Sequence, residues 1–293
     1  MKIIFAGRDN NFNRRYIKEL SREHELLCCL FLEPNRFKPV NRIKRIIGRI
    51  KKYGILTAMN EVLFHCLDRI YIRKHESGFI KTKKEYFLDK AELECPEFQV
   101  DNIHDEHWLK LVKGLAPDII FSMCCNVKFR KEFYSIPRLG TFVLHEGLTP
   151  EYKGLHTILW ALLKKDFEHI GYTLLQVNDK MDDGGILAQG NYQLKKGENH
   201  RTWSWVSHNA LIEGLDNVKR ALRKLEDFQS FEPLKTNGRI QGTYTWMTLT
   251  RYLYYSRLSS VSQASGSFAL YPQKERRTDY RLSIRHNSHQ PLE

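Results

Sequence analysis

The amino-acid sequence predicts an α/β protein with a mostly parallel central sheet. Apolar runs of strand length alternate with amphipathic segments of helical length along most of the 293 residues, an order that is typical of parallel sheets. Hydrophobic residues make up 42% of the chain, enough to bury a large core. The apolar start at residues 3–6 is too short for a signal peptide, and no apolar run reaches the ~18 residues of a membrane span. A cytoplasmic location is therefore expected.

The predicted elements follow one another in a regular order. Strands are expected at 2–7, 25–31, 117–125 and 140–145, and a hairpin-like pair at 169–178 and 185–194, joined by the turn MDDGG at 181–185. Helices are expected at 11–20, 104–115, 157–166 and 200–228. These elements define a catalytic domain at residues 1–228 with a basic helical insertion at 33–90. Residues 229–293 form a C-terminal extension that is expected to include an aromatic docking element and a partly disordered tail.

The insertion carries nearly all of the chain's excess charge. The formal net charge is +13, and between Arg36 and Lys84 there are 14 basic and 3 acidic residues. Isoleucines at helical spacing within 42–52 indicate a basic amphipathic helix, and a second apolar stripe follows at 59, 63, 67 and 70. Two readings stay open: helices that pack on the main domain, or a surface for an anionic partner. Among such partners, peripheral membrane contact through 42–52 is favoured over RNA, because RNA sites usually add stacking aromatic residues.

The six cysteines follow no metal-site or disulfide spacing, so reduced, buried thiols and no metal site are expected. In open α/β sheets, ligands bind beyond the carboxyl ends of the strands. Those ends carry Arg8, Cys124, Asn126 and His145. The turn after the first strand is not a G-x-G-x-x-G loop, which argues against a nicotinamide or flavin site.

A set of ordered motifs begins at the fourth predicted strand. His145 ends that strand, and a Leu-x-Pro-x-Tyr-Lys-Gly loop, a Trp-Ala helix, Gly-x-Thr and Asp-x-Gly-x-Ile follow. This order resembles the folate-dependent formyltransferase family. The matching residues are His145, Leu148, Pro150, Tyr152, Lys153, Gly154, Trp160, Ala161, Gly171, Thr173, Asp182, Gly184 and Ile186.

The resemblance implies a Rossmann-like formyltransferase fold and formyl transfer from 10-formyltetrahydrofolate to an amine. In the family, a histidine and an asparagine stabilise the oxyanion, and an aspartate orients the histidine and relays the proton. His145 and Asp182 occupy two of these positions, but Val143 stands where the family has its asparagine. Asn126 and His156 are the candidate replacements for the missing donor, whose loss typically costs ~10²–10³ in rate.

The resemblance also assigns residues to the two ligands. Cofactor binding is expected from Cys124, Leu148, Pro150 and Gly184, and substrate binding from Arg8, Glu146, Tyr152, Lys153 and Trp160. The substrate is expected to be a small molecule, phosphorylated or nucleotide-linked, most plausibly an amino sugar of surface-polysaccharide synthesis. A nucleic-acid partner is not expected, and a homodimer stays open. The alternatives are an N-acyl hydrolase of the same fold and a catalytically silent protein that docks on an anionic surface.

Overall fold

The computed structural model describes residues 1–32, 47–125, 127–264 and 281–282. Its main sheet contains β1 (Lys2–Gly7), β2 (Glu25–Leu32), β3 (Glu97–Val100), β4 (Ile119–Met123), β5 (Gly140–Glu146), β7 (Gly171–Gln176), β8 (Ile186–Asn191) and β10 (Arg281–Leu282). Two short strands, β6 (Lys153–Gly154) and β9 (Thr243–Tyr244), form a separate parallel pair. The helices are α1 (Asn11–Ser21), α3 (Ile55–Leu67), α4 (Arg73–Ile80), α5 (Lys84–Phe87), α6 (Glu106–Leu115), α7 (Lys131–Tyr134), α8 (Thr157–Lys164), α9 (Trp203–Phe228) and α10 (Leu249–Ala264).

The main sheet has the strand order β10-β8-β7-β5-β4-β1-β2-β3. The strands from β3 to β5 in this order are parallel to one another, whereas β7 runs antiparallel to β5, β8 to β7, and β10 to β8. The α/β class with a mostly parallel sheet is therefore confirmed, as is the hairpin of β7 and β8. β3, α7 and the β6–β9 pair were not predicted, because segments of two to four residues carry too little periodicity.

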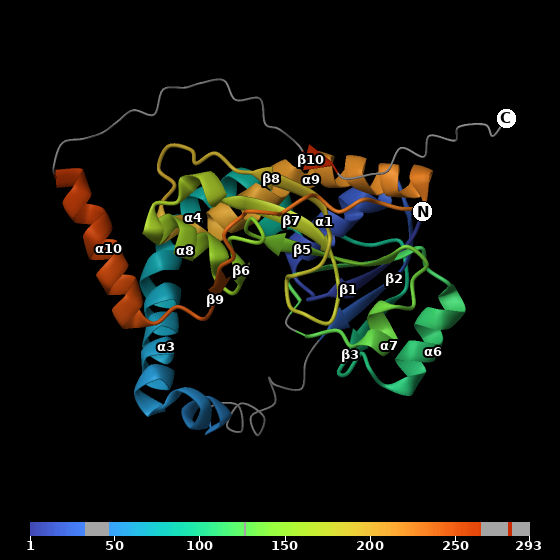
Figure 1. Ribbon diagram of the computed structural model, residues 1–293, viewed down its shortest axis with the longest axis horizontal. Helices are drawn as coiled ribbons and strands as arrows, with labels where there is room; N and C mark the ends of the chain where they lie inside the picture. Colours follow the sequence, from blue (N-terminus) through green and yellow to red (C-terminus); the bar gives the residue numbers. More distant parts are fainter. Residues whose placement is uncertain (33–46, 126, 265–280, 283–293) are drawn as a thin grey trace.

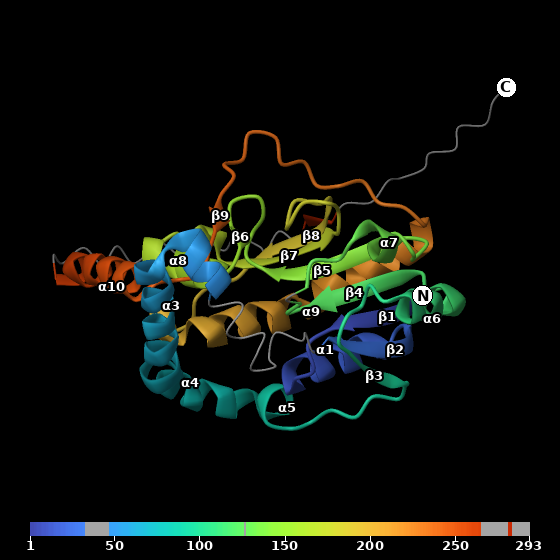
Figure 2. The ribbon, with the colours of Figure 1, turned by 90° about the horizontal axis from the view of Figure 1, so that it is seen from below.

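Alternating side chains of the central strands fill two separate cores. Phe5 and Phe121 pack with α1 and α9 on one face, and Ile4 and Ile120 pack with α6 and α7 on the other. Figures 1 and 2 show the long helix α9 running along the first face. This period of two explains why β1, β2 and β4 read as continuous apolar runs, since both of their faces are covered.

Within the basic insertion, α3 lies at one end of the molecule, far from α6, whereas α5 packs against α1 (Figures 1 and 2). Residues 47–53 are helical, and α3 then continues through the π-helical turn Asp68–Ile72 into α4. The predicted stripe is helical, but Met59, Leu63 and Ile70 are exposed. The predicted Ile43 and Ile46 lie outside the described residues. Sequence periodicity identified the apolar face but not the direction in which it points.

Buried carboxylates help to attach this insertion to the main body. The Glu76 carboxylate accepts backbone N–H groups of Ser204 and Trp205 at 2.8 and 3.0 Å, at the start of α9. Asp68 accepts the indole N–H of Trp203 at 3.0 Å. Because the first N–H groups of a helix have no partner within the helix, Glu76 acts as a cap supplied by a distant segment.

The segment that follows α9 returns across the sheet before α10 begins (Figures 1 and 2). β9 within it pairs with β6, and α10 packs against α3 and α8. The expected disordered tail falls mostly on residues 265–280 and 283–293, which lie outside the described part of the chain. The cysteines are free, but Cys66 and Cys124 are exposed, so the expectation of buried thiols was wrong for these two.

Glu76 predicts a measurable pH dependence of stability. Burial raises its pKa from 4.5 to about 7. The folded protein therefore holds a proton that the unfolded chain has lost, and stability falls as the pH rises from 4.5 through about 7. Glu76→Gln keeps the acceptor oxygen and cannot ionise. It should gain about 1–3 kcal/mol relative to the wild type between pH 5 and pH 8 in urea unfolding.

Glu106→Gln is the matched control, because this side chain is 81% exposed and pairs with Lys110 on the surface. Its effect on the free energy of unfolding should be small at both pH values, because an exposed ion pair contributes little to stability. A Glu76→Gln difference that stays constant between the two pH values would contradict the proposed ionisation.

Candidate active site

His145 and Glu146 leave the end of β5 on opposite faces of the sheet. The His145 side chain lies on the same face of the sheet as Val143 and has a relative exposure of 8%. Glu146 instead turns toward α9, where its carboxylate accepts the hydroxyl of Ser207. Adjacent residues of a strand point in opposite directions. The structure therefore does not bring Glu146 together with the His145 side chain.

The His145 imidazole is held between the loop after β5 and the turn after β7. Its Nε2 lies 2.9 Å from the carbonyl oxygen of Tyr152, and we assign a proton to Nε2 because a carbonyl can only accept. Its Nδ1 lies 3.9 Å from a carboxylate oxygen of Asp182. That distance exceeds a direct hydrogen bond. Nδ1 is therefore the nitrogen that can exchange a proton.

Asp182 is positioned by backbone geometry as well as by its contacts. It adopts φ of 51°, a left-handed conformation that Asp and Asn tolerate better than most residues. Its second carboxylate oxygen accepts the backbone N–H of Gly154 at 3.0 Å. Gly184 follows where a Cβ atom would lie 1.6 Å from the carbonyl oxygen of Gln176. The turn can therefore close on β7 only with glycine at this position.

Lys153 is engaged by neighbouring side chains. Its ammonium donates to Asp183 at 2.8 Å and to Gln241 at 3.2 Å. This bond holds the pKa of Asp183 below its usual range. Gln241 comes from the segment after α9, so the C-terminal extension contributes directly to the frame of the site. The sequence offered no signal for this contact, because the two residues are 88 positions apart.

Tyr152 and Trp160 support the loop from behind. The Tyr152 hydroxyl donates to Asp166 at 2.8 Å, and its ring stacks on Tyr244 at 4.8 Å. The Trp160 indole donates to the carbonyl of Thr245 at 3.0 Å. The contacts with Tyr244 and Thr245 tie Tyr152 and Trp160 to the β9 region. None of these contacts involves His145.

His156 lies in an aromatic cluster on the side of the insertion. Its ring is 4.8 Å from that of Trp246 and 5.1 Å from that of Trp203, and its Nδ1 accepts the backbone N–H of Met247 at 3.4 Å. Burial lowers the pKa of His156 to about 3. The neutral His156 ring is therefore held by the segment before α10. The structure shows no contact between His156 and His145.

The remaining predicted residues lie around the loop after β5 and the ends of β1 and β4. Leu148 is buried, and Pro150 follows a cis peptide bond. Cys124 is exposed, with φ of 50°, directly after β4. Arg8 is exposed directly after β1. Asn126 lies outside the described residues, so the structure does not place it.

Two polar residues near the site were missed in the sequence. Ser122 in β4 pairs with Val143 in the neighbouring parallel strand, so both lie on the face of His145. The Ser122 hydroxyl is buried and has no hydrogen-bond partner among the described residues. Arg239 forms a two-bond pair with Glu151, at 2.7 and 2.5 Å. A serine inside the apolar run IIFSM was the available signal for Ser122.

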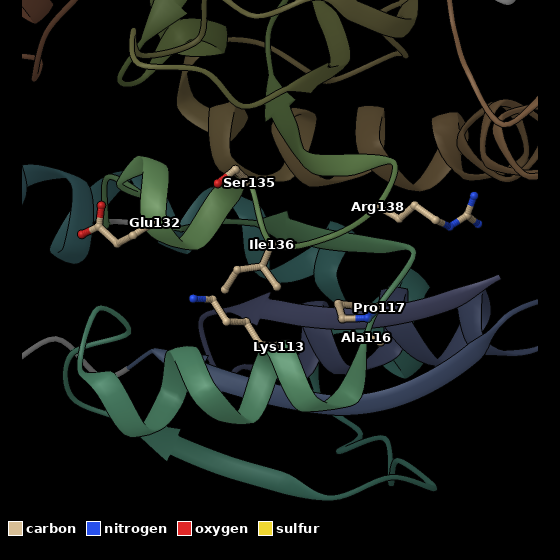
Figure 3. Close-up of a pocket in the computed structure, with 7 residues that line it drawn as sticks. All are labelled: Lys113, Ala116, Pro117, Glu132, Ser135, Ile136 and Arg138. Atoms are coloured by element: carbon tan, nitrogen blue, oxygen red, sulfur yellow. The ribbon is translucent and has the colours of Figure 1, made fainter.

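A surface pocket of about 520 Å³ lies elsewhere (Figure 3). It is lined by α6, α7 and the segments that enter β4 and β5, including Ala116, Pro117 and Arg138. These are the amino ends of the strands, the edge opposite to His145. Ligands of open α/β sheets bind at the carboxyl ends. We therefore place the candidate active site at His145 and Asp182 and not in this pocket.

A histidine and an aspartate at the carboxyl edge of a mostly parallel sheet define an α/β protein with a candidate acid–base site. Residues 74–210, which include both side chains, match the formyl transferase family. This segment of the chain resembles that family, and by the resemblance Val143 stands where the family has its asparagine.

Individual relatives agree with this assignment. The chain is 27% identical over 150 residues to the bifunctional polymyxin resistance protein ArnA of Wigglesworthia glossinidia brevipalpis, covering 51% of this chain and 21% of ArnA. It is 28% identical over 141 residues to methionyl-tRNA formyltransferase of Thermodesulfovibrio yellowstonii, covering 46% of each. The chain thus spans less than half the length of these two relatives. Glycinamide ribonucleotide transformylase 1 of Symbiobacterium toebii shares the fold, with 12% identity, a TM-score of 0.50 and coverage of 83% and 94%.

The tight turn at Gly184 gives a test of the site's frame. Gly184→Ala places a methyl group against the Gln176 carbonyl, so the turn must open. We expect a loss of about 2–4 kcal/mol in the free energy of unfolding, the range of strongly disruptive substitutions. Gly114→Ala is the control, because that position in α6 has nothing within 4 Å. It should be neutral or stabilise by up to about 1 kcal/mol. Equal effects of the two substitutions would contradict the close contact.

Proposed function

We propose that the protein transfers a formyl group from 10-formyltetrahydrofolate to an amine. The observation that carries this proposal is the pairing of His145 with Asp182 inside the segment that matches the family. When bound, 10-formyltetrahydrofolate would supply the activated formyl group. The chain supplies a buried imidazole with one nitrogen fixed on a carbonyl and the other beside a carboxylate.

The residues around His145 offer one group that could bind the oxygen of the formyl group. Formyl transfer needs a hydrogen-bond donor for the formyl oxygen, and Val143 cannot provide one. Ser122 lies beside Val143 on the same face, and its buried hydroxyl has no partner among the described residues. A buried hydroxyl without a hydrogen-bond partner lowers the stability of the fold, and a bound formyl oxygen would give it a partner. We propose that Ser122 takes over the donor role of the missing asparagine.

His145 and Asp182 would manage the proton of the reaction. The attacking amine loses a proton when its nitrogen bonds to the formyl carbon, and the departing nitrogen gains one. His145 Nδ1 accepts the proton and returns it to the departing nitrogen, so the ring ends unchanged. Asp182 stabilises the charged ring, and the Gly154 N–H keeps the carboxylate in place. The Tyr152 carbonyl keeps the Nε2 proton out of the exchange.

The acceptor in this proposal is the amine of a nucleotide-linked amino sugar, used in surface-polysaccharide synthesis. The support is the resemblance to the formyltransferase family, which includes amino-sugar formyltransferases. Residues 1–228 would form the catalytic unit, with Gln241 and Arg239 of the extension bracing the site loop. The free thiols fit a cytoplasmic location for this reaction.

Conservative changes of the pair test the proposed activity. His145→Gln and Asp182→Asn should each lower the rate of formyl transfer by about 10²–10⁴, because each removes part of the proton relay. Asn tolerates the left-handed conformation, so Asp182→Asn should keep the melting temperature. The assay follows N-formylation of a nucleotide-linked amino sugar with 10-formyltetrahydrofolate.

Two controls separate this activity from the alternatives. Saturating 10-formyltetrahydrofolate should raise the melting temperature of the wild type, by mass action on the folded state. Release of formate from an N-formylated sugar without folate would instead identify a hydrolase. If the wild type shows neither a thermal shift nor turnover, the proposed transferase is rejected and a silent binding protein remains.

Ser122 gives a second, independent prediction. Ser122→Ala removes an unsatisfied buried hydroxyl, so stability should stay equal or rise, while the transfer rate should fall by about 10–10³. Val143→Asn restores the family's amide and should raise the rate of the wild type by about 10-fold or more, whereas Val143→Leu should not. A Ser122→Ala enzyme of unchanged rate would show that the hydroxyl has no part in the reaction.

A further inference from the structure

The outer side of α3 exposes a row of large apolar side chains. It comprises Ile55, Leu56, Met59, Val62 and Leu63 of the helix, and Ile70 of the π-helical turn, each between 49% and 76% exposed. We call these six residues the α3 face. They recur at helical spacing and so share one side of the helix. The opposite side packs on the protein through Ala58 and Phe64. Monomeric proteins rarely expose such continuous apolar surfaces without an interaction to serve.

All acidic side chains between residues 47 and 84, a range that the structure describes throughout, are buried. Glu61 pairs with Arg49, and Asp68 and Glu76 bind groups at the start of α9. Their relative exposures are 9%, 5% and 3%. The exposed charges in this range are therefore basic: Lys51, Lys52, Arg69, Arg73, Lys74, Lys81 and Lys84. The α3 face is apolar with a positively charged surround.

We propose that the α3 face docks on the surface of an anionic lipid bilayer. An apolar helix side flanked by lysine and arginine is the arrangement by which interfacial helices insert side chains among the lipids and attract acidic headgroups. Among the described residues no helix is long and apolar enough to cross a bilayer, so the contact is with the surface. α3 lies at one end of the molecule with α10 beside it (Figures 1 and 2), and the six side chains of the α3 face are exposed.

The charge distribution argues against the other occupants. A second copy that met this surface face to face would bring two sets of lysines and arginines together, with no exposed carboxylate in 47–84 to pair with them. The exposed α3 face is aliphatic, whereas single-stranded nucleic acids are bound through stacking aromatic residues. A fluid bilayer needs no matching groove and accepts a convex helix side.

Co-sedimentation with vesicles tests the proposal on the full chain. The protein should bind phosphatidylcholine vesicles that contain phosphatidylglycerol, bind pure phosphatidylcholine vesicles more weakly, and lose binding as salt screens the charges. Leu56→Ser/Met59→Ser should weaken binding about tenfold or more, because the inserted apolar area is lost. Lys51→Glu/Lys52→Glu should weaken binding to the acidic vesicles.

Leu88→Ser/Ile240→Ser is the matched control. These side chains are 54% and 82% exposed, against 55% and 76% for Met59 and Leu56, but they lie outside the α3 face. The control should bind vesicles like the wild type, and melting temperatures should show that every variant is folded. The proposal is overturned if acidic vesicles do not bind the wild type, or if the Leu56→Ser/Met59→Ser variant binds them as well as the Leu88→Ser/Ile240→Ser control does. It is also overturned if the Leu56→Ser/Met59→Ser change dissolves a dimer or abolishes RNA binding while vesicle binding persists.

Discussion

The hydrogen bond from the Gly154 backbone N–H to the Asp182 carboxylate holds together two loops that are 28 residues apart. The first loop leaves β5 and supplies the Tyr152 carbonyl that fixes His145. The second leaves β7 and carries Asp182 in a left-handed conformation. The ion pair between Lys153 and Asp183 joins the same two loops. The end of β5 and the hairpin turn are therefore linked at two adjacent points, and the sheet register between β5 and β7 sets the distance between the two side chains.

Sequence reasoning predicted the parts of this frame that depend on local pattern. The strand that ends at His145, the hairpin and its Asp-Gly-Gly turn each carry their own periodicity or turn chemistry. Glu146 shows the limit of this approach, because it follows His145 in the chain but its side chain lies on the opposite face of the sheet. Gln241 and Arg239 show another limit, since contacts across about 90 residues leave no local trace. The orientation of the α3 helix is likewise set by packing against α10 and not by its own pattern.

The basic insertion and the candidate site are connected by α9. Glu76 caps the start of that helix, and Ser207, one turn further along, binds Glu146 at the end of β5. The insertion therefore attaches to the same rigid helix that backs the site strand. Asp68 and Glu76 make these attachments and Glu61 pairs with Arg49, so the exposed charge between residues 47 and 84 is entirely basic.

The left-handed backbone at Asp182 has an evolutionary consequence. Asparagine and glycine also accept this conformation, and both are reached from aspartate codons by one base change. An asparagine there can still accept the Gly154 N–H, so the frame would survive the loss of the negative charge. Chemistry and folding are thus separable at this position by a single mutation. A gene that encodes this fold has a short route from a working site to a purely binding one, and an equally short route back.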